Sequence, residues 1–162
     1  MNIEAPLLLH RDTVRAEWID YNGHMNLAYY VLIFDHATDA FLDYIGITAI
    51  FRQENQSSTF AAESHVTYEK EVKLGDEVII KTQLLAYDEK RIHYFHYMYL
   101  SDEDVLVATS ELMLLYMDMK ERRVSAMPEE FQNKLNNIDS AHKQLPSPKQ
   151  MGSVIGVKAR SQ

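Results

Sequence analysis

Hydrophobic residues recur at helical spacing from Leu27 to Ile45. The positions of this face repeat every three or four residues, at 27, 30, 31, 34, 38, 41 and 45. Asn26 stands where a helix N-cap is expected, and Gly46 is a suitable stop. The pattern therefore predicts one long helix with a wide buried face.

The polar positions of this helix predict its solvent-facing side. His36, Asp39 and Asp43 fall opposite the apolar stripe, so we expect them to be solvated. Asp35 lies at the edge of the stripe, and we expect it to be a polar group near the core.

The chain beyond this helix has the composition of strands. Segments rich in Val, Ile, Thr, Tyr and Phe cover residues 58–73, 77–87, 91–101 and 105–119, and residues 8–18 form a further candidate strand. Turn-like residues separate the four later segments, which predicts antiparallel strands joined by short hairpins. A single helix buries its stripe against such a sheet by lying across one face, so the predicted class is α+β with two layers.

The remaining segments complete the predicted organisation. Residues 47–56 are expected to form a short connection with some helical character, Pro128 opens a short helix, and residues 139–151 form an extended tail. A chain of 162 residues with 46% hydrophobic content suits one domain with its own core. We assign residues 1–138 to that domain and residues 139–162 to a C-terminal extension of it.

Composition narrows the possible functions. The net charge of -8 argues against general binding to nucleic acid or to an anionic membrane surface, because both need basic patches. The absence of Cys excludes disulfides, thiolate nucleophiles and Cys-bound metals. No signal-peptide pattern occurs, and no apolar run approaches the ~20 residues of a membrane span, so we expect a cytoplasmic protein. Chemistry must then come from carboxylates, His, hydroxyls or the backbone.

The most informative segment is residues 18–26, directly before the helix. Asp20 supplies a carboxylate, Asn22-Gly23 predicts a turn, and Asn26 marks the start of the helix. The unpaired amides and the dipole at a helix N-terminus stabilise negative charge. These residues suit attack on a carbonyl and binding of the oxyanion that forms. On its own, however, an Asp before Asn-Gly is more often a turn former than a catalytic group.

The run Asp20-x-x-Gly23-His24-x-Asn26-x-x-x-Tyr30 resembles the motif of the 4-hydroxybenzoyl-CoA thioesterase-like branch of the hotdog-fold acyl-CoA thioesterases. The longer sequence from residues 17–26 through 34–39 to 63–68 is similar to betainyl-CoA thioesterases, which are associated with carnitine dehydrogenase. This similarity covers nearly the whole chain, including residues 152–156. One departure matters. Many relatives carry a second Asp two residues before the catalytic one, where this chain has Trp18, so the role of that Asp cannot be carried over.

The resemblance implies a hotdog fold, in which a long central helix packs on an antiparallel sheet, and an acyl-CoA substrate. It implies hydrolysis of a short acyl-CoA, in particular betainyl-CoA to betaine and CoA, with no metal or redox cofactor. It also implies a homodimer, or a dimer of dimers, whose sheets join edge to edge and whose active sites are built from both subunits. The rival interpretations are a thioesterase for another short or medium acyl chain and a hotdog domain that binds acyl-CoA without turnover.

The resemblance also assigns catalytic roles. Asp20 occupies the position of the catalytic Asp, which attacks the thioester carbonyl or activates a water molecule that does so. Backbone amides around Asn26 and Leu27 would hold the oxyanion. His24 is expected to position the carboxylate or the substrate, although a turn His is often only structural.

Aromatic residues gather around this motif. Trp18, Tyr21, Tyr29 and Tyr68 are candidates for an aromatic cage around a quaternary ammonium group such as that of a betainyl chain, and Gly23 and Tyr30 complete the candidate substrate-binding set. The alternative for the tyrosines is ordinary packing, and Gly23 is also explained by backbone conformation.

No metal site is predicted. His93 and His96 are three residues apart on a predicted strand and so point to opposite faces, without a third ligand at zinc-like spacing. The basic clusters Lys90-Arg91 and Lys120-Arg122-Arg123 are candidates to bind the CoA phosphates, although charged residues are common in turns in any case.

Overall fold

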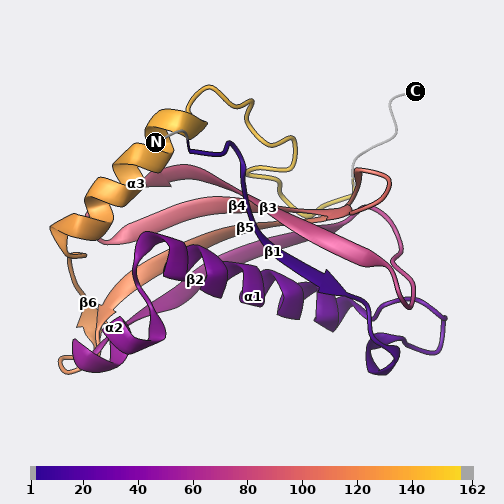
Figure 1. The fold of residues 1–162 in the computed structure, drawn as a ribbon, viewed down its shortest axis with the longest axis horizontal. Coiled ribbons are helices and arrows are strands. Elements are labelled where there is room, and N and C mark those ends of the chain that lie inside the picture. The colour runs from indigo at the N-terminus through magenta and orange to yellow at the C-terminus, as the bar shows by residue number, and fades with distance from the viewer. Residues whose placement is uncertain (1–2, 158–162) are drawn as a thin grey trace.

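The computed structural model describes residues 3–157 (Figure 1). Residues 1–2 and 158–162, which the predicted ranges 1–138 and 139–162 include, lie outside this part of the chain. The elements in chain order are β1 (Leu7–Thr13), a 3-10 helix (Ala16–Trp18), α1 (Leu27–Ile45), α2 (Ala49–Glu54), β2 (Ser57–Tyr68), β3 (Glu77–Tyr87), β4 (Arg91–Leu100), β5 (Val105–Asp118), β6 (Arg123–Val124) and α3 (Glu129–His142).

The strands form one curled antiparallel sheet, and α1 lies across its face (Figure 1). The strand order is β1-β3-β4-β5-β2, with the short β6 paired to β5. The predicted α+β class and hotdog arrangement are therefore confirmed. β2 is the last strand in this order, so one of its edges has no partner strand within residues 3–157.

The predicted hairpin series is right for β3, β4 and β5 but wrong for β2. β2 pairs with β5 and not with β3, which follows it in the chain. The connection after β2 is held at the end of the sheet, where the Met25 amide donates to the Val72 carbonyl (2.8 Å) and the Val14 amide to the Asp76 carbonyl (2.9 Å). These bonds hold the connection between β2 and β3 against the segments before β3. The chain therefore crosses the end of the sheet and does not turn back from β2 into β3 as a hairpin.

Helix α1 has the predicted bounds and caps. The side chain of Asn26 accepts a hydrogen bond from the Ala28 amide, and Gly46 ends the helix at φ 102°, a conformation that suits glycine. Ile33, Phe34 and Phe41 are fully buried between helix and sheet. The buried face is narrower than predicted, because Leu27 is 62% exposed and Val31 is 45% exposed.

The exposed part of α1 runs beside β2. Asp35, Thr38 and Leu42 share a shallow pocket with Ser58 and Ala61 of β2, and Val31 lies one turn before Asp35. Asp35 is exposed on this side and is not near the core, contrary to the prediction. This face of α1 therefore lies beside β2, and Val31, which is exposed, continues it toward the start of the helix.

Other boundaries also differ from the sequence prediction. β1 stops at Thr13 and β2 stops at Tyr68, because the chain leaves the sheet there to form the connections around the start of α1. Helix α3 runs to His142, inside the predicted extended tail. His142 is buried, and its ring accepts from the Leu84 amide (2.9 Å), which fixes the end of α3 to β3.

His96 of β4 is fully buried in the core. Its ring stacks on Phe34, and its two nitrogens bond to the hydroxyls of Thr38 (3.1 Å) and Thr82 (3.0 Å). His93 lies on the other face of the strand and pairs with Glu111, so the prediction that the two histidines point apart is confirmed.

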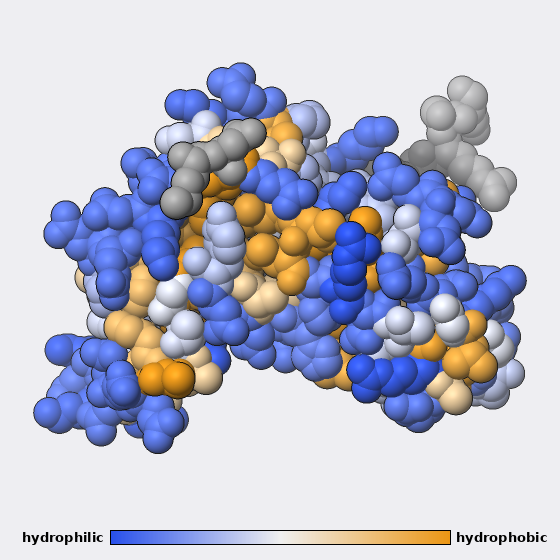
Figure 2. Space-filling model, viewed as in Figure 1, coloured by the Kyte–Doolittle hydropathy of each residue, from blue (hydrophilic) through white to orange (hydrophobic). Residues whose placement is uncertain are grey.

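Most of the surface seen in Figure 2 is hydrophilic, and hydrophobic side chains gather in its middle and at the end that carries the segment before α1. Within residues 3–157, no helix is long and apolar enough to cross a membrane.

Candidate active site

The segment before α1 forms a tight loop around Asp20. The Gly23 amide donates to the Asp20 carbonyl (3.0 Å) and the Asp20 amide donates to the His24 carbonyl (3.0 Å). Gly23 has φ 81°, so its predicted backbone role is supported by a conformation that other residues rarely adopt. The Asp20 Oδ1 atom accepts from the Asn22 amide at 2.8 Å. Within residues 3–157, Oδ2 of Asp20 has no hydrogen-bond partner, and it is thus free to act on a substrate.

The first turn of α1 presents its amides to the same loop. The Asn26 amide is already bonded to the Trp18 carbonyl (2.9 Å), and the Ala28 amide is bonded to the Asn26 side chain (3.0 Å). The Tyr29 amide donates to the Asn26 carbonyl. Among residues 3–157, the Leu27 amide has no acceptor, which makes it the better oxyanion donor of the two that the sequence suggested.

A cleft of about 520 Å³ joins these groups. Its walls are the loop, the start of α1 and the chain that follows β2; the lining residues are Asp20, Tyr21, Asn22, His24, Met25, Asn26, Leu27, Tyr30, Tyr68, Glu69, Lys70 and Glu71. The candidate catalytic residues Asp20, His24 and Leu27 thus share one cleft. An Asp carboxylate and a free helix-terminal amide in one cleft can attack a carbonyl and stabilise the resulting negative charge.

The sequence reasoning missed the chain after β2. Glu71 Oε2 lies 2.9 Å from His24 Nε2, and the Tyr30 hydroxyl donates to the Lys70 carbonyl (3.2 Å). Glu71 is far from the motif in sequence, and its exposed side chain follows no pattern. The crossing of β2 to the end of the sheet brings it to the loop.

The aromatic residues form two separate pairs. Tyr30 and Tyr68 meet edge to face with ring centroids 5.3 Å apart, and both line the cleft. Burial raises the pKa of both hydroxyls above the usual value. Tyr21 lines the cleft rim and is 96% exposed.

Trp18 and Tyr29 stack on each other at 5.4 Å and are not among the cleft-lining residues. The Trp18 ring is 4% exposed and already carries the guanidinium of Arg15 at 4.7 Å. The structure of a single chain therefore does not bring all four predicted cage residues together.

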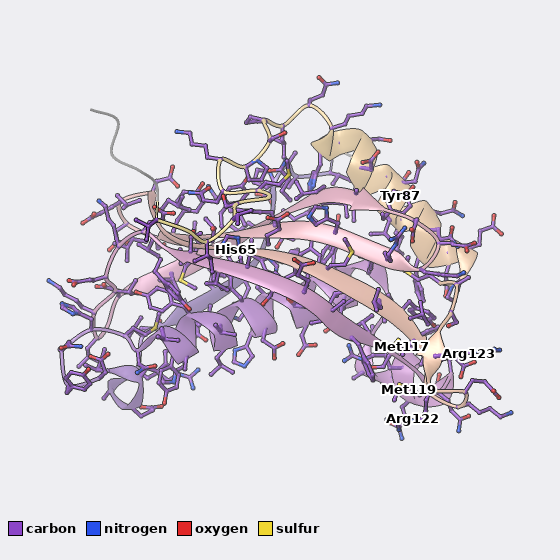
Figure 3. The ribbon with its side chains drawn as sticks, turned by 180° about the vertical axis from the view of Figure 1, so that it is seen from behind. His65, Tyr87, Met117, Met119, Arg122 and Arg123 are labelled. Carbon is purple, nitrogen blue, oxygen red and sulfur yellow. The ribbon has the colours of Figure 1, made fainter. Side chains whose placement is uncertain are left out.

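The two predicted phosphate-binding clusters differ in their surroundings. Lys90 pairs with Glu89 at 3.1 Å, and Arg91 donates to Asp88 at 2.7 Å. Within residues 3–157, no ion pair involves Lys120, Arg122 or Arg123. Figure 3 shows Arg122 and Arg123 at the end of the sheet near β6, away from the loop before α1.

Comparison with known proteins identifies the class. Residues 14–135 match the family described as the Thioesterase-like superfamily, and the chain belongs to it. The catalytic-type cleft and the hotdog fold agree with this assignment, which makes the chain a thioester hydrolase.

Individual relatives are similar over nearly the whole chain. The betainyl-CoA thioesterase of Pseudomonas aeruginosa is 38% identical over 151 residues, covering 93% of this chain and 95% of that protein. The L-carnitine dehydrogenase/betainyl-CoA thioesterase of Agrobacterium fabrum is 38% identical over 152 residues, which are 94% of this chain but 31% of that longer protein.

Solved structures support the fold. A protein from Staphylococcus aureus in complex with CoA superposes with a TM-score of 0.89 at 30% identity, covering 98% of this chain and 100% of that one. A 1,4-dihydroxy-2-naphthoyl-CoA thioesterase from Synechocystis gives a TM-score of 0.72 at 11% identity over 82% of this chain and 97% of that one, which shows a shared fold alone.

Proposed function

We propose that this chain is an acyl-CoA thioesterase that hydrolyses betainyl-CoA to betaine and CoA. The observation that carries the proposal is the cleft in which the free Asp20 oxygen and the unpaired Leu27 amide meet. Similarity to betainyl-CoA thioesterases over nearly the full chain supports the acyl group, and the CoA complex of a similar fold supports the carrier.

In the proposed reaction the thioester carbonyl lies over the first turn of α1. Asp20 attacks the carbonyl carbon or takes a proton from a water molecule that attacks it. The carbonyl oxygen gains negative charge, which the Leu27 N–H and the helix dipole stabilise. When water is the nucleophile, the C–S bond then breaks, the proton taken by Asp20 passes to the sulfur, and CoA leaves as a thiol while the acyl group leaves as an acid that ionises to the carboxylate. When Asp20 is the nucleophile, breaking the C–S bond leaves an anhydride between Asp20 and the acyl group, and CoA leaves as a thiolate that takes a proton from solvent. A water molecule then hydrolyses this anhydride to the acyl carboxylate and free Asp20.

The lining of the cleft suits a cationic acyl group. Tyr30 and Tyr68 offer aromatic surface, and the lining holds three carboxylates, of Asp20, Glu69 and Glu71, against the single amine of Lys70. A trimethylammonium group is attracted by both features, whereas a neutral group of the same shape gains only from contact.

The test compares two substrates of nearly the same shape. Betainyl-CoA carries a trimethylammonium head, and 3,3-dimethylbutyryl-CoA carries a tert-butyl head in its place. We expect betainyl-CoA to have the higher kcat/KM by about 10-fold, on the order of the 1–2 kcal/mol of a cation–aromatic contact. Equal values, or a preference for the neutral substrate, would assign the chain to another acyl group.

A variant of Tyr68 tests whether this side chain recognises the trimethylammonium group. Tyr68→Leu removes the aromatic face while keeping apolar volume, so it should reduce kcat/KM for betainyl-CoA more than for 3,3-dimethylbutyryl-CoA. Trp18→Phe is the control, because Trp18 is buried beside Arg15 and Tyr29 outside the cleft lining. An equal loss for both substrates in Tyr68→Leu would indicate packing alone.

We also propose that the active site is completed in a homodimer joined along β2. Its unpaired edge and the exposed Leu27, Val31 and Phe60 nearby provide an apolar surface for a second copy. In a two-fold antiparallel pairing, the Ser57 end of β2 lies beside the Tyr68 end of the partner strand. The turn of residues 119–123 adjoins the Ser57 end, because the Met119 amide donates to the Gln56 carbonyl. The pairing would thus carry this basic turn toward the partner's cleft, where CoA phosphates need cations.

A further inference from the structure

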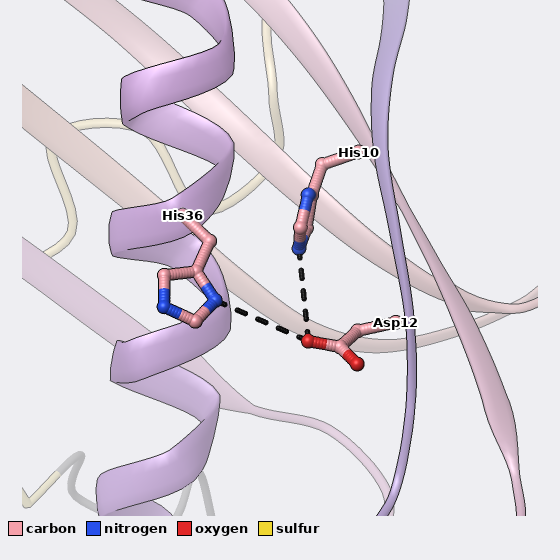
Figure 4. Close-up of side chains that lie close together, drawn as sticks. All are labelled: His10, Asp12 and His36. Atoms are coloured by element: carbon pink, nitrogen blue, oxygen red, sulfur yellow. Dashed lines mark ion pairs between the residues drawn. The ribbon is translucent and has the colours of Figure 1, made fainter. Parts of the chain in front are cut away.

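Three polar side chains meet between β1 and α1, away from the cleft (Figure 4). His10 and Asp12 are two residues apart on β1 and so share one face of the strand, and His36 reaches them from the middle of α1. Each offers one ligand atom, and the three atoms lie within 4.8 Å of one another. Within residues 3–157, no other trio of His, Asp and Glu ligand atoms is this close.

The nitrogen–oxygen distances in this trio are longer than those of a direct hydrogen bond. His10 Nε2 and His36 Nδ1 both point at the same oxygen, Asp12 Oδ2, and each is 3.9 Å from it (Figure 4). By contrast, two other histidine–carboxylate pairs in the described part of the chain are in direct contact, at 2.9 Å for His24 with Glu71 and 2.8 Å for His93 with Glu111. The trio is therefore not a set of direct ion pairs, and its three ligand atoms stand apart from one another.

The ligand atoms are also held in place. Asp12 Oδ1 accepts from the Thr13 amide (2.8 Å) and lies 3.4 Å from Arg15, which fixes the carboxylate and leaves Oδ2 directed at the histidines. The Nε2 atom of His10 is buried and has no hydrogen-bond partner among residues 3–157. A metal binds the lone pair of a neutral imidazole, and the buried Nε2 atom of His10 is directed at Oδ2 of Asp12, where it can offer that lone pair.

We propose that His10, Asp12 and His36 bind a divalent first-row transition metal, with Zn²⁺ as the best fit. Two imidazoles and one carboxylate form a donor set that zinc accepts while keeping a fourth position for water. Neighbouring ligand atoms of a tetrahedral zinc site lie about 3.3 Å apart, so the two 3.9 Å separations from Asp12 must shorten by roughly 0.6 Å, and side-chain rotations must also bring the two histidine nitrogens, now within 4.8 Å of each other, to the same spacing. The ion ties β1 to α1.

The sequence predicted no metal site among the seven histidines, because none of them stands with a carboxylate or a third histidine at zinc-like spacing. The His-x-Asp spacing on β1 was readable from the sequence, but the third ligand comes from a helix face predicted to be solvated. His36 is only half-exposed, because that face turns toward β1.

The location gives the ion a structural role. α1 carries the first-turn amides of the cleft at its N-terminus, and His36 lies more than two turns further along the same helix. A metal there does not contact the cleft, whose lining includes none of its three ligands. Its expected effect is on the stability of the β1–α1 contact.

The test uses the full-length, tag-free chain after treatment with a chelator. Titration with ZnCl₂ in a calorimeter should show one ion bound per chain, and CoCl₂ should give the visible absorption of a low-coordinate Co²⁺ site. His36→Ala removes a half-exposed ligand with little packing cost, and it should weaken Zn²⁺ binding by at least ~100-fold, because even contacts outside the ligand shell cost 10–100-fold. His65→Ala, which removes a histidine elsewhere, should bind like the wild type.

Thermal unfolding gives an independent readout. Added ZnCl₂ should raise the Tm of the wild type and of His65→Ala, since a ligand that binds only the folded state stabilises it, and should leave the Tm of His36→Ala unchanged. Asp12→Asn provides a second ligand variant with the same expected loss. Wild-type protein that binds no Zn²⁺ or Co²⁺, or His36→Ala and Asp12→Asn proteins that bind Zn²⁺ as tightly as the wild type, overturns the proposal.

Discussion

The side-chain oxygen of Asn26 accepts the Ala28 amide at 3.0 Å, and this bond decides which donor of the first turn remains for a substrate. With the Asn26 amide bonded to Trp18, the amide of Leu27 is left over in the described part of the chain. A main-chain donor has no side chain to truncate, so its role must be tested through the backbone.

Leu27→Pro removes this N–H and little else. Proline is well tolerated at the first position of a helix, and the preceding Asn26 has the extended conformation that proline requires, with φ -62° and ψ 142°. Loss of one oxyanion donor costs about 10²–10³ in rate in other enzymes, so we expect a loss of that size in kcat. Leu27→Ala, which keeps the N–H at an exposed position, is the control. Unchanged kcat in a folded Leu27→Pro protein places the oxyanion site elsewhere.

Asp20→Asn tests the nucleophile or base. The change is nearly isosteric and the amide oxygen still accepts the Asn22 amide, so the loop should keep its shape while turnover falls by at least ~10². Glu17→Gln is the matched control, because Glu17 is an exposed carboxylate just outside the loop and does not line the cleft. Thiol release from acyl-CoA measures both. Near-normal turnover in folded Asp20→Asn protein would falsify the assignment.

The two basic clusters should behave differently toward CoA. Lys120→Ala/Arg122→Ala/Arg123→Ala should raise KM for acyl-CoA with kcat nearly unchanged, since phosphate contacts are equal in the ground and transition states. It should also flatten the salt dependence of KM. Lys90→Ala/Arg91→Ala should change neither, because both cations are already paired with Glu89 and Asp88. If the KM of both variants equals that of the wild type, other residues hold the phosphates.

His96 should make the fold sensitive to acid. Burial lowers the pKa of its imidazole to about 3 in the folded state, from 6.5 in the unfolded chain. Between these values the unfolded chain binds more protons, so the free energy of unfolding falls as pH drops below about 6.5, by at most ~1.4 kcal/mol per pH unit from this group. Urea unfolding at pH 8 and pH 5 measures the slope.

His96→Gln should be less stable at pH 8, because it disturbs the bonds to Thr38 and Thr82, but its stability should fall less steeply with acid. His65→Gln serves as the control for losing a histidine. An unchanged slope in His96→Gln would assign the acid sensitivity to other groups, of which His10 and His142 also have a pKa lowered by burial.

Local signals predicted the parts of the structure that depend on local interactions. The bounds of α1 follow from Asn26, Gly46 and a period that only a helix satisfies, and the motif around Asp20 identified the loop of the cleft. The strands of the β3–β5 series were also placed closely, because short turns force neighbours in sequence to pair.

Features that depend on distant contacts were not predictable in this way. The alternation of β2 fits either β3 or β5 as a partner, and the choice is made by the bonds that hold residues 69–76 near Met25 and Val14. Glu71 reaches His24 only because of that choice. The exposure of Leu27 and Val31 could not be predicted from the spacing of hydrophobic residues alone. An apolar helix face has the same sequence pattern whether its own sheet or a second copy of the chain covers it.

The unpaired edge of β2 has a consequence for how the enzyme is assayed. If the turn of residues 119–123 of a second copy completes each cleft, a separated subunit has Asp20 and Leu27 but lacks part of its CoA site. Activity per chain is then a property of protein concentration and should decline on dilution at subsaturating acyl-CoA, in step with the dissociation of dimers seen by sedimentation. A fall in turnover on dilution would thus report the separation of two β2 edges.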